Sequence, residues 1–187
     1  MLDALLKRLR GRPSDPSPKP EDGAYDYARL EPLGPHRLRL LSCCMADRPN
    51  LPGYLPPPPP NADLLVVFRD YAKRMSALMG EDEGPLATAL VAALRMMAGE
   101  RAAIAVILDN LPTERVVLDQ GAGYCMIAPY GALRAALPLP ADFPDAYALV
   151  EGSQAQARLR AWLEENGDAL HWDEAAGAWK VEVIDRR

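Results

Sequence analysis

The chain has 187 residues, of which 49 % are hydrophobic and 25 % charged, and its formal net charge is −5. This balance is typical of a globular domain with its own core. The negative charge and the low aromatic content of 6 % argue against nucleic acid as the main ligand, because nucleic-acid binders present a basic surface with stacking aromatics.

The location expected from the sequence is the bacterial cytoplasm. No apolar run is long enough to span a membrane, and Lys7 and Arg8 interrupt the only apolar stretch near the N-terminus, so no secretory signal is predicted. Arginine outnumbers lysine, and alanine and proline are abundant, which is typical of GC-rich bacterial genomes.

Residues 1–23 are expected to form a short amphipathic helix and a flexible Pro/Ser linker. One stripe of the helix carries four leucines at helical spacing: Leu2, Leu5, Leu6 and Leu9. Residues 11–23 offer nothing to bury. Since so short a helix is marginal in water, its leucines must dock on the chain's own domain, on a partner protein or on a membrane surface. A membrane would bind such a segment only weakly, and the leucines are candidate partner-binding residues.

A proline-rich arm covers residues 49–60. Its run of five prolines predicts an extended polyproline II rod, because each ring fixes φ and removes a backbone donor. Leu51, Tyr54 and Leu55 flank the prolines and are candidate contacts for a partner that recognises such a rod. The alternative is a strut that lies on the protein's own surface and leads into the next helix.

Two long helices are expected after the arm. The first begins at Asn61 as N-cap and ends at Gly80, and the second begins at Pro85 and keeps helical phase across Gly99. A short acidic turn joins them, which predicts an antiparallel helical hairpin. For residues 102–109, a strand is the alternative.

Several short strands are expected in the rest of the chain. Residues 37–45 begin with Arg/Leu alternation, residues 115–129 surround a Gly-rich turn, and residues 146–152 form a further candidate. Residues 170–184 predict a β-hairpin. One face of this hairpin should carry its apolar side chains: Leu170, Trp172, Trp179, Val181 and Val183.

A further helix should begin after Ser153, which forms a capping box with Gln156, and should end at Gly167. Residues 130–137 predict one or two helical turns. The whole therefore predicts an α+β fold in which the antiparallel helical hairpin packs on a small antiparallel sheet, preceded by the extended arm. We expect residues 24–187 to form a single domain.

The best catalytic candidate is a cysteine–histidine pair. Cys125 would be the nucleophile, His171 the base, and Asp173 or Asp119 the group that orients the histidine. Such chemistry needs a thiolate, which requires a nearby cation or helix N-terminus. On a predicted strand, however, Cys125 is more typical of a small hydrophobic residue, and we favour that interpretation.

No metal or cofactor is expected. The segment GAGYC lacks the third glycine of a dinucleotide fingerprint, and the acidic cluster at residues 80–84 lacks the alternating spacing of a calcium loop. Cys43 and Cys44 are adjacent, which rarely lets both thiolates reach one tetrahedral zinc ion, and we expect both to be reduced.

The sequence therefore favours a non-enzymatic protein-binding module, such as an adaptor, an inhibitor or immunity-type protein, or an assembly factor. The partner would be another protein, and a homo-oligomer is compatible with the same features. The alternative is an enzyme or small-ligand-binding protein with a pocket near Cys125 and His171, which would use Tyr124 or Tyr130.

Overall fold

The computed structural model describes residues 35–44, 55, 58, 62–79, 84–112 and 122–182. Within this part of the chain it contains six α-helices and one two-stranded antiparallel sheet, which confirms the α+β class. The helices and strands, in chain order, are α2 (Pro35–Ser42), α3 (Leu64–Met79), α4 (Pro85–Met97), α5 (Ala102–Asp109), α6 (Ala122–Ala136), α7 (Gln154–Asn166), β1 (Leu170–Asp173) and β2 (Ala178–Val181).

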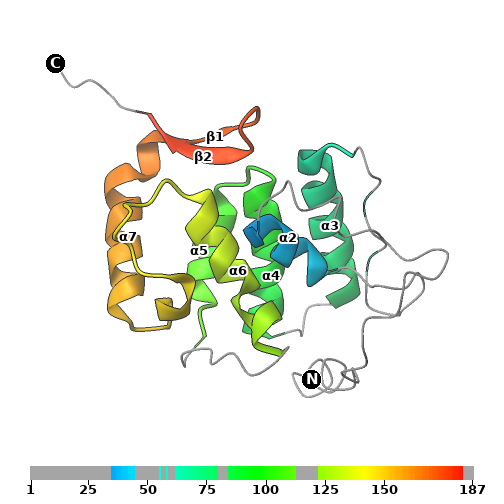
Figure 1. Cartoon of the computed structure of the whole chain (residues 1–187), viewed down its shortest axis with the longest axis horizontal. Helices are drawn as coiled ribbons and strands as arrows, with labels where there is room; N and C mark the ends of the chain where they lie inside the picture. The colour runs from blue at the N-terminus through cyan, green and yellow to red at the C-terminus, as the bar shows by residue number, and fades with distance from the viewer. Residues whose placement is uncertain are drawn as a thin grey trace.

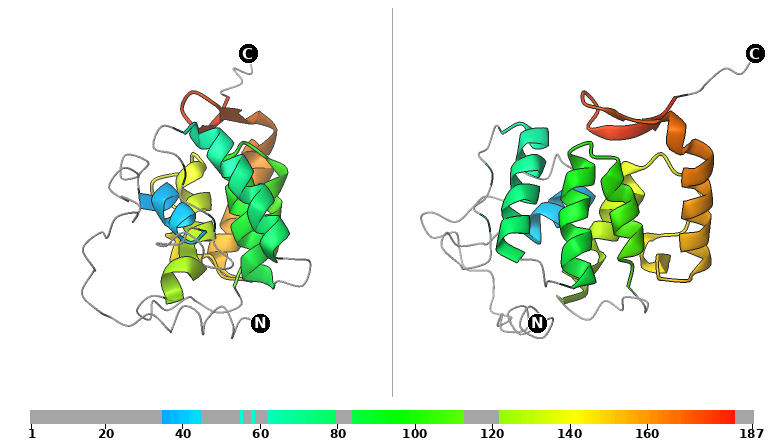
Figure 2. Two further views of the ribbon diagram at one scale, coloured as in Figure 1. Left: turned by 90° about the vertical axis from the view of Figure 1, so that its right-hand side faces the viewer. Right: turned by 180° about the vertical axis from the view of Figure 1, so that it is seen from behind.

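The helices form two layers. Helices α3, α4, α5 and α7 lie side by side in one row, and α2 and α6 cover one face of that row (Figures 1 and 2). The β-hairpin lies across one end of α4, α5 and α7 (Figure 1). The core lies between the layers, where residues from α2, α3, α4, α5 and α6 pack in one cluster. Helix α7 stands at the edge of the row.

Helix α3 begins later than expected. Asp63 is its N-cap, because one carboxylate oxygen accepts hydrogen bonds from the backbone N–H of Leu65 at 2.8 Å and of Val66 at 3.3 Å. The prediction that Asn61 caps this helix was wrong, and Asn61 itself lies outside the described residues, as does Gly80. Phe68, Tyr71 and Met75, which recur at helical spacing, are all buried, whereas Leu78 on the same predicted stripe is 51 % exposed.

The second predicted helix is two helices. Pro85 begins α4 as expected, but α4 ends at Met97, and Gly99 adopts a φ of +87° that reverses the chain into α5. Helices α3 and α4 pack against each other as the predicted hairpin requires, and α5 packs on α4 as a third member. Residues 102–109 are helical, so the alternative of a strand was wrong.

Three predicted strand segments are not strands where the structure describes them, and residues 45 and 115–121 of these segments lie outside the described residues. Residues 35–42 form α2, in which Leu40 and Leu41 are fully buried, and Cys44 is buried in the turn that follows the helix. Helix α6 contains most of the segment after the Gly-rich turn, and residues 146–148 form a single 3₁₀ turn. Burial on several sides explains the error in α6, because every residue from Ile127 to Leu133 is buried and no period of two or of 3.6 marks the element.

The C-terminal elements agree with the sequence. The Ser153 hydroxyl accepts a hydrogen bond from the backbone N–H of Gln156 at 3.1 Å, and Gly167 follows the last residue of α7. The capping box is half formed, because the Gln156 side chain accepts from the backbone N–H of Gly152 rather than of Ser153. In the hairpin, Trp172 pairs with Trp179 and Leu170 pairs with Val181, so these four side chains share one face as predicted. The fifth residue predicted for that face, Val183, lies outside the described residues.

Candidate functional site

The structure does not bring the predicted catalytic pair into a described contact. Cys125 belongs to α6 rather than to a strand, its side chain lies outside the described part, and so does Asp119. His171 is exposed on β1, with Nδ1 3.4 Å from the carbonyl oxygen of Ala169. Asp173 accepts a hydrogen bond from Lys180, which lowers the pKa of this carboxyl group. Catalysis by Cys125 and His171 therefore stays a prediction.

The predicted partner-binding residues are mostly outside the described residues. These are Leu2, Leu5, Leu6, Leu9, Leu51 and Tyr54. Leu55 is described, is 2 % exposed, and donates its backbone N–H to the carbonyl oxygen of Cys44 at 2.8 Å. Its side chain therefore packs in the chain's own core, as the strut interpretation of the arm implies for this position.

Neither described cysteine is in a disulfide. Cys44 is buried and its thiol donates to the carbonyl oxygen of Leu40 at 3.4 Å, whereas Cys43 is half-buried. Among the described residues, no group of three or more His, Cys, Asp or Glu side chains is placed to hold a metal ion. None of the helices in that same part of the chain combines the length and the apolar character needed to cross a membrane.

Tyr130, a residue of the predicted ligand pocket, is a core residue in α6. It is 2 % exposed, and its hydroxyl donates to the carbonyl oxygen of Asn110 at 2.9 Å. Burial raises the pKa of this phenol to about 12. The phenol is therefore fully protonated at neutral pH and ties α6 to the end of α5.

This burial predicts a loss of stability in alkali. In the native state the phenol ionises near pH 12 and in the unfolded chain near 10, so between these values the native state binds more protons. The free energy of unfolding should fall by about 1.4 kcal/mol per pH unit across this window. Below about pH 9, Tyr130 should add nothing to the pH dependence of the stability, because its phenol is protonated in both states. Urea denaturation at a series of pH values from 8 to 11.5 measures this decrease in the free energy of unfolding.

Tyr130→Phe is the matched control, because it keeps the ring and leaves the other tyrosines to titrate. At pH 8 this variant should lose about 1 kcal/mol with the hydrogen bond to Asn110. Its stability should then decline less steeply than that of the wild type above pH 10. Parallel declines in the two proteins would contradict the assignment to Tyr130.

A groove lies between α5 and α7. It has a volume of about 300 Å³. Its lining comes from both helices and the start of the hairpin: Arg101, Ile104, Ala105, Leu108, Arg160, Leu163, Glu164, Gly167 and Leu170. We call this set the α5–α7 groove. Ile104, Leu108 and Leu170 form a largely covered floor, whereas Ala105 is exposed and Leu163 half-buried.

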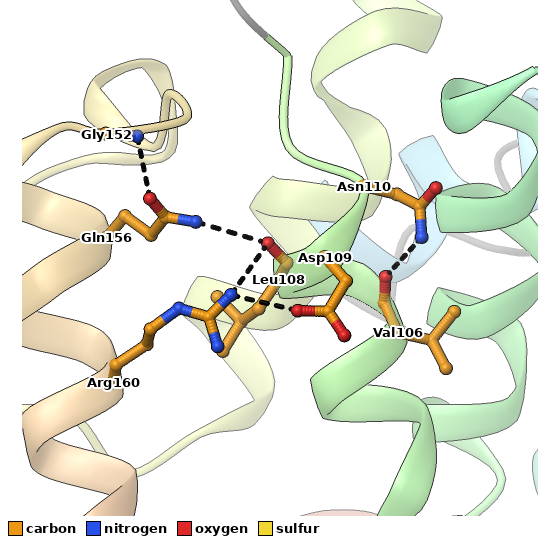
Figure 3. A network of polar contacts seen from close by, with 7 residues as sticks. All are labelled: Val106, Leu108, Asp109, Asn110, Gly152, Gln156 and Arg160. Atoms are coloured by element: carbon orange, nitrogen blue, oxygen red, sulfur yellow. Dashed lines mark hydrogen bonds and ion pairs between the residues drawn. The ribbon is translucent and has the colours of Figure 1, made fainter.

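Polar side chains of α7 fix one end of this groove (Figure 3). The carbonyl oxygen of Leu108, near the end of α5, accepts from the Gln156 amide at 3.3 Å and from Arg160 at 3.5 Å. Arg160 also pairs with Asp109 at 2.9 Å, and the Gln156 oxygen accepts from the backbone N–H of Gly152. These contacts satisfy a carbonyl at a helix end that would otherwise lack a partner.

The contacts at the two ends of the groove show the relative direction of α5 and α7. At the far end, a Cβ on Gly167 would lie 3.3 Å from the guanidinium of Arg101, which pairs with the exposed Asp168 at 3.7 Å. Because Arg160 lies beside the end of α5 and Gly167 beside its start, α7 runs antiparallel to α5. Both arginines are about half exposed, so they line the groove and still reach solvent.

A second hollow of about 330 Å³ lies under the hairpin turn. Its lining includes Arg37, Asp63, Phe68, Trp172 and Glu174. The indole N–H of Trp172 is buried and has no hydrogen-bond partner in the described part of the chain. This atom is shielded from solvent, and the pyrrole edge that carries it faces Gly99.

No protein-family model, no curated protein sequence and no solved structure matches this chain. Sequence reasoning missed the α5–α7 groove, because its walls come from segments far apart along the chain. The one local signal was the spacing of Gln156, Arg160 and Glu164, which recur every four residues on one face of α7.

Proposed function

We propose that this chain is a non-enzymatic protein-binding module of the bacterial cytoplasm, such as an adaptor, an inhibitor or an assembly factor. The α5–α7 groove is its binding surface. The observation that carries the proposal is a groove between two antiparallel helices, with apolar side chains between charged ones.

The shape of the groove favours a helical segment of a partner. Helix-in-groove recognition uses apolar side chains at positions i, i+3, i+4 and i+7, which enter a trough between two helices. Ala105 leaves room on the α5 wall, and Leu163 offers apolar surface on the α7 wall. At about 300 Å³ the groove holds two or three such side chains, which points to a short segment and moderate affinity.

The experiment is a selection of random twelve-residue peptides displayed on phage against the immobilised full chain. Enriched peptides should carry leucine or similar residues at helical spacing. A selected peptide should bind Ala105→Trp at least about ten-fold more weakly than the wild type, because the indole fills the groove. Fluorescence anisotropy with the labelled peptide measures the affinity.

Ala77→Trp is the matched control, because Ala77 is also an exposed helical alanine but lies on α3. This variant should bind the selected peptide within about two-fold of the wild type. The proposal would be overturned by a selection that enriches no helical pattern, or by peptides whose affinity is the same for both tryptophan variants. Thermal melts of the variants confirm that each is folded.

A further inference from the structure

We propose that the hollow under the hairpin turn binds a free α-amino acid with an apolar side chain. The carboxylate of this ligand pairs with Arg37, its ammonium group lies between Glu174 and Asp63, and its side chain contacts the apolar floor. This inference goes beyond the proposed function and does not depend on it, because the described linings of this hollow and of the α5–α7 groove share no residue.

Four separate parts of the fold meet at this hollow. Arg37 comes from α2, Asp63 precedes α3 and Met97 ends α4. Trp172 and Glu174 come from the hairpin, whose turn points toward the end of the helix row at which α3 begins (Figure 1). Each part is held by the packing of its own element, so the hollow is formed before a ligand arrives, and little ordering opposes binding.

Arg37 supplies the positive charge of the hollow. Its guanidinium donates a hydrogen bond to the carbonyl oxygen of Gly177, and a Cβ added to Gly177 would lie 3.1 Å from Nη2. A carbonyl carries no net charge, and no carboxylate in the described part of the chain forms an ion pair with Arg37. A half-buried guanidinium that is held in place without a counter-ion is suited to bind a carboxylate.

Two carboxylates supply the negative charge. Glu174 is exposed, and its side chain has no hydrogen-bond or ion-pair partner among the described residues. Asp63 caps α3 with Oδ1, which leaves Oδ2 available to the hollow. The nearby carboxylate of Asp173 is already paired with Lys180 and is not part of the lining. Glu174 and Asp63 are therefore the groups that receive the ammonium group of the ligand.

The two signs of charge lie within reach of one small molecule. The backbone N–H of Gly177 donates to the carbonyl oxygen of Glu174 at 3.3 Å, which closes a four-residue turn. The Cα atoms at the ends of such a turn are less than about 7 Å apart. Because Arg37 lies against Gly177, its guanidinium and the Glu174 carboxylate stand on the same turn without touching.

This mixture of charges selects a zwitterion. A ligand with only an ammonium group would bring a second cation beside Arg37, and a ligand with only a carboxylate would face Glu174 and Asp63. Each of these would leave one charge of the hollow without a partner and add a like-charge repulsion. An α-amino acid carries both charges on neighbouring groups and pairs with all three side chains.

The apolar part of the hollow suits a side chain of about the size of leucine. Phe68 and Met97 are buried, and Leu64, Leu65 and Trp172 are half-buried beside them. The volume of about 330 Å³ is near the lower limit for small-molecule sites, which is about 300 Å³. It therefore fits a single amino acid rather than a nucleotide or a peptide.

Calorimetric titration of the full chain with L-leucine, L-methionine and L-phenylalanine tests the proposal. At least one of them should bind with a dissociation constant between about 10 μM and 1 mM, as a ligand of this size can. For leucine, isoamylamine lacks only the carboxylate and 4-methylpentanoate lacks only the ammonium group. Each analogue should bind at least about ten-fold more weakly than leucine.

Glu174→Gln removes one partner of the ammonium group. It should weaken the binding of the amino acid about five- to twenty-fold and should not weaken that of 4-methylpentanoate, which has no ammonium group. Glu182→Gln is the matched control, because Glu182 is also an exposed glutamate of the hairpin segment but does not line the hollow. This variant should bind the amino acid within about two-fold of the wild type.

Arg37→Met should weaken the amino acid and 4-methylpentanoate alike, and thermal melts show whether this variant is folded. If it does not fold, the two analogues and Glu174→Gln still decide the question. The proposal would be overturned if none of the three amino acids binds at about 10 mM, if an analogue binds as tightly as leucine, or if Glu174→Gln has no effect. None of these results concerns helical peptides in the α5–α7 groove, so the two proposals fail separately.

Discussion

Replacing Gly99 with alanine should lower the free energy of unfolding by about 2–4 kcal/mol. Gly99 has a φ of +87°, a backbone conformation that costs an L-residue energy. A Cβ at this position would also lie 2.9 Å from Cδ1 and 3.0 Å from Cγ of the Trp172 indole. Urea denaturation of the wild type and the variant measures the loss.

Gly152→Ala is the matched control, because Gly152 has a similar φ of +72° but no atom within 4 Å of the added Cβ. It should lose only the backbone part, about 1 kcal/mol. The difference between the two variants then measures the contact with Trp172. Similar losses at the two glycines would mean that the indole moves aside freely.

The second large effect is expected for Trp179→Ala, at about 3–5 kcal/mol. Trp179 is 4 % exposed, and its indole N–H donates to the carbonyl oxygen of Met96 at 3.2 Å. Its ring meets that of Trp172 edge to face, with centroids 5.4 Å apart. Removing the indole leaves a cavity and separates the hairpin from the end of α4.

Trp179→Phe separates the loss of the indole hydrogen bond from the loss of the aromatic ring. Phenylalanine keeps an aromatic ring but removes the indole hydrogen bond to the Met96 carbonyl, which still accepts from the backbone N–H of Gly99 at 3.0 Å, so this variant should lose about 1–3 kcal/mol. Denaturant midpoints of the two variants, compared with that of the wild type, give the measurement. If both variants are as stable as the wild type, the hairpin contributes nothing to the stability of the domain.

The elements that the sequence predicted well are those specified by neighbouring residues. The Ser153 cap needs only Gln156 three positions later, and the register of the hairpin follows from alternation between Leu170 and Trp172. Helix α3 was predicted from a stripe that faces one side. In each case the local pattern and the final environment agree.

The errors come from segments whose environment is set by distant parts of the chain. Helix α6 packs against α2 and α4 and is buried on several sides, so its sequence shows no clear period. Pro129, which indicated the end of a strand, lies inside this helix and is fully buried. Its missing N–H removes one helical hydrogen bond, and burial of the ring compensates for that loss.

The candidate site could not be predicted for the same reason. The α5–α7 groove lies where Arg160 and Gln156 of α7 reach the end of α5, which is about fifty residues away in the chain. A surface assembled from separate helices leaves no continuous motif in the sequence.

The two helices that form the walls of the groove differ in how extensively they pack against the rest of the fold. Of the thirteen residues of α7, Ala155 and Leu159 are the two that are fully buried, whereas α5 packs tightly on α4. A wall held by so few apolar contacts should open in small excursions well below global unfolding. A ligand that fills the groove would then also order α7. The measured binding free energy would therefore include the entropic cost of restricting the motion of that helix.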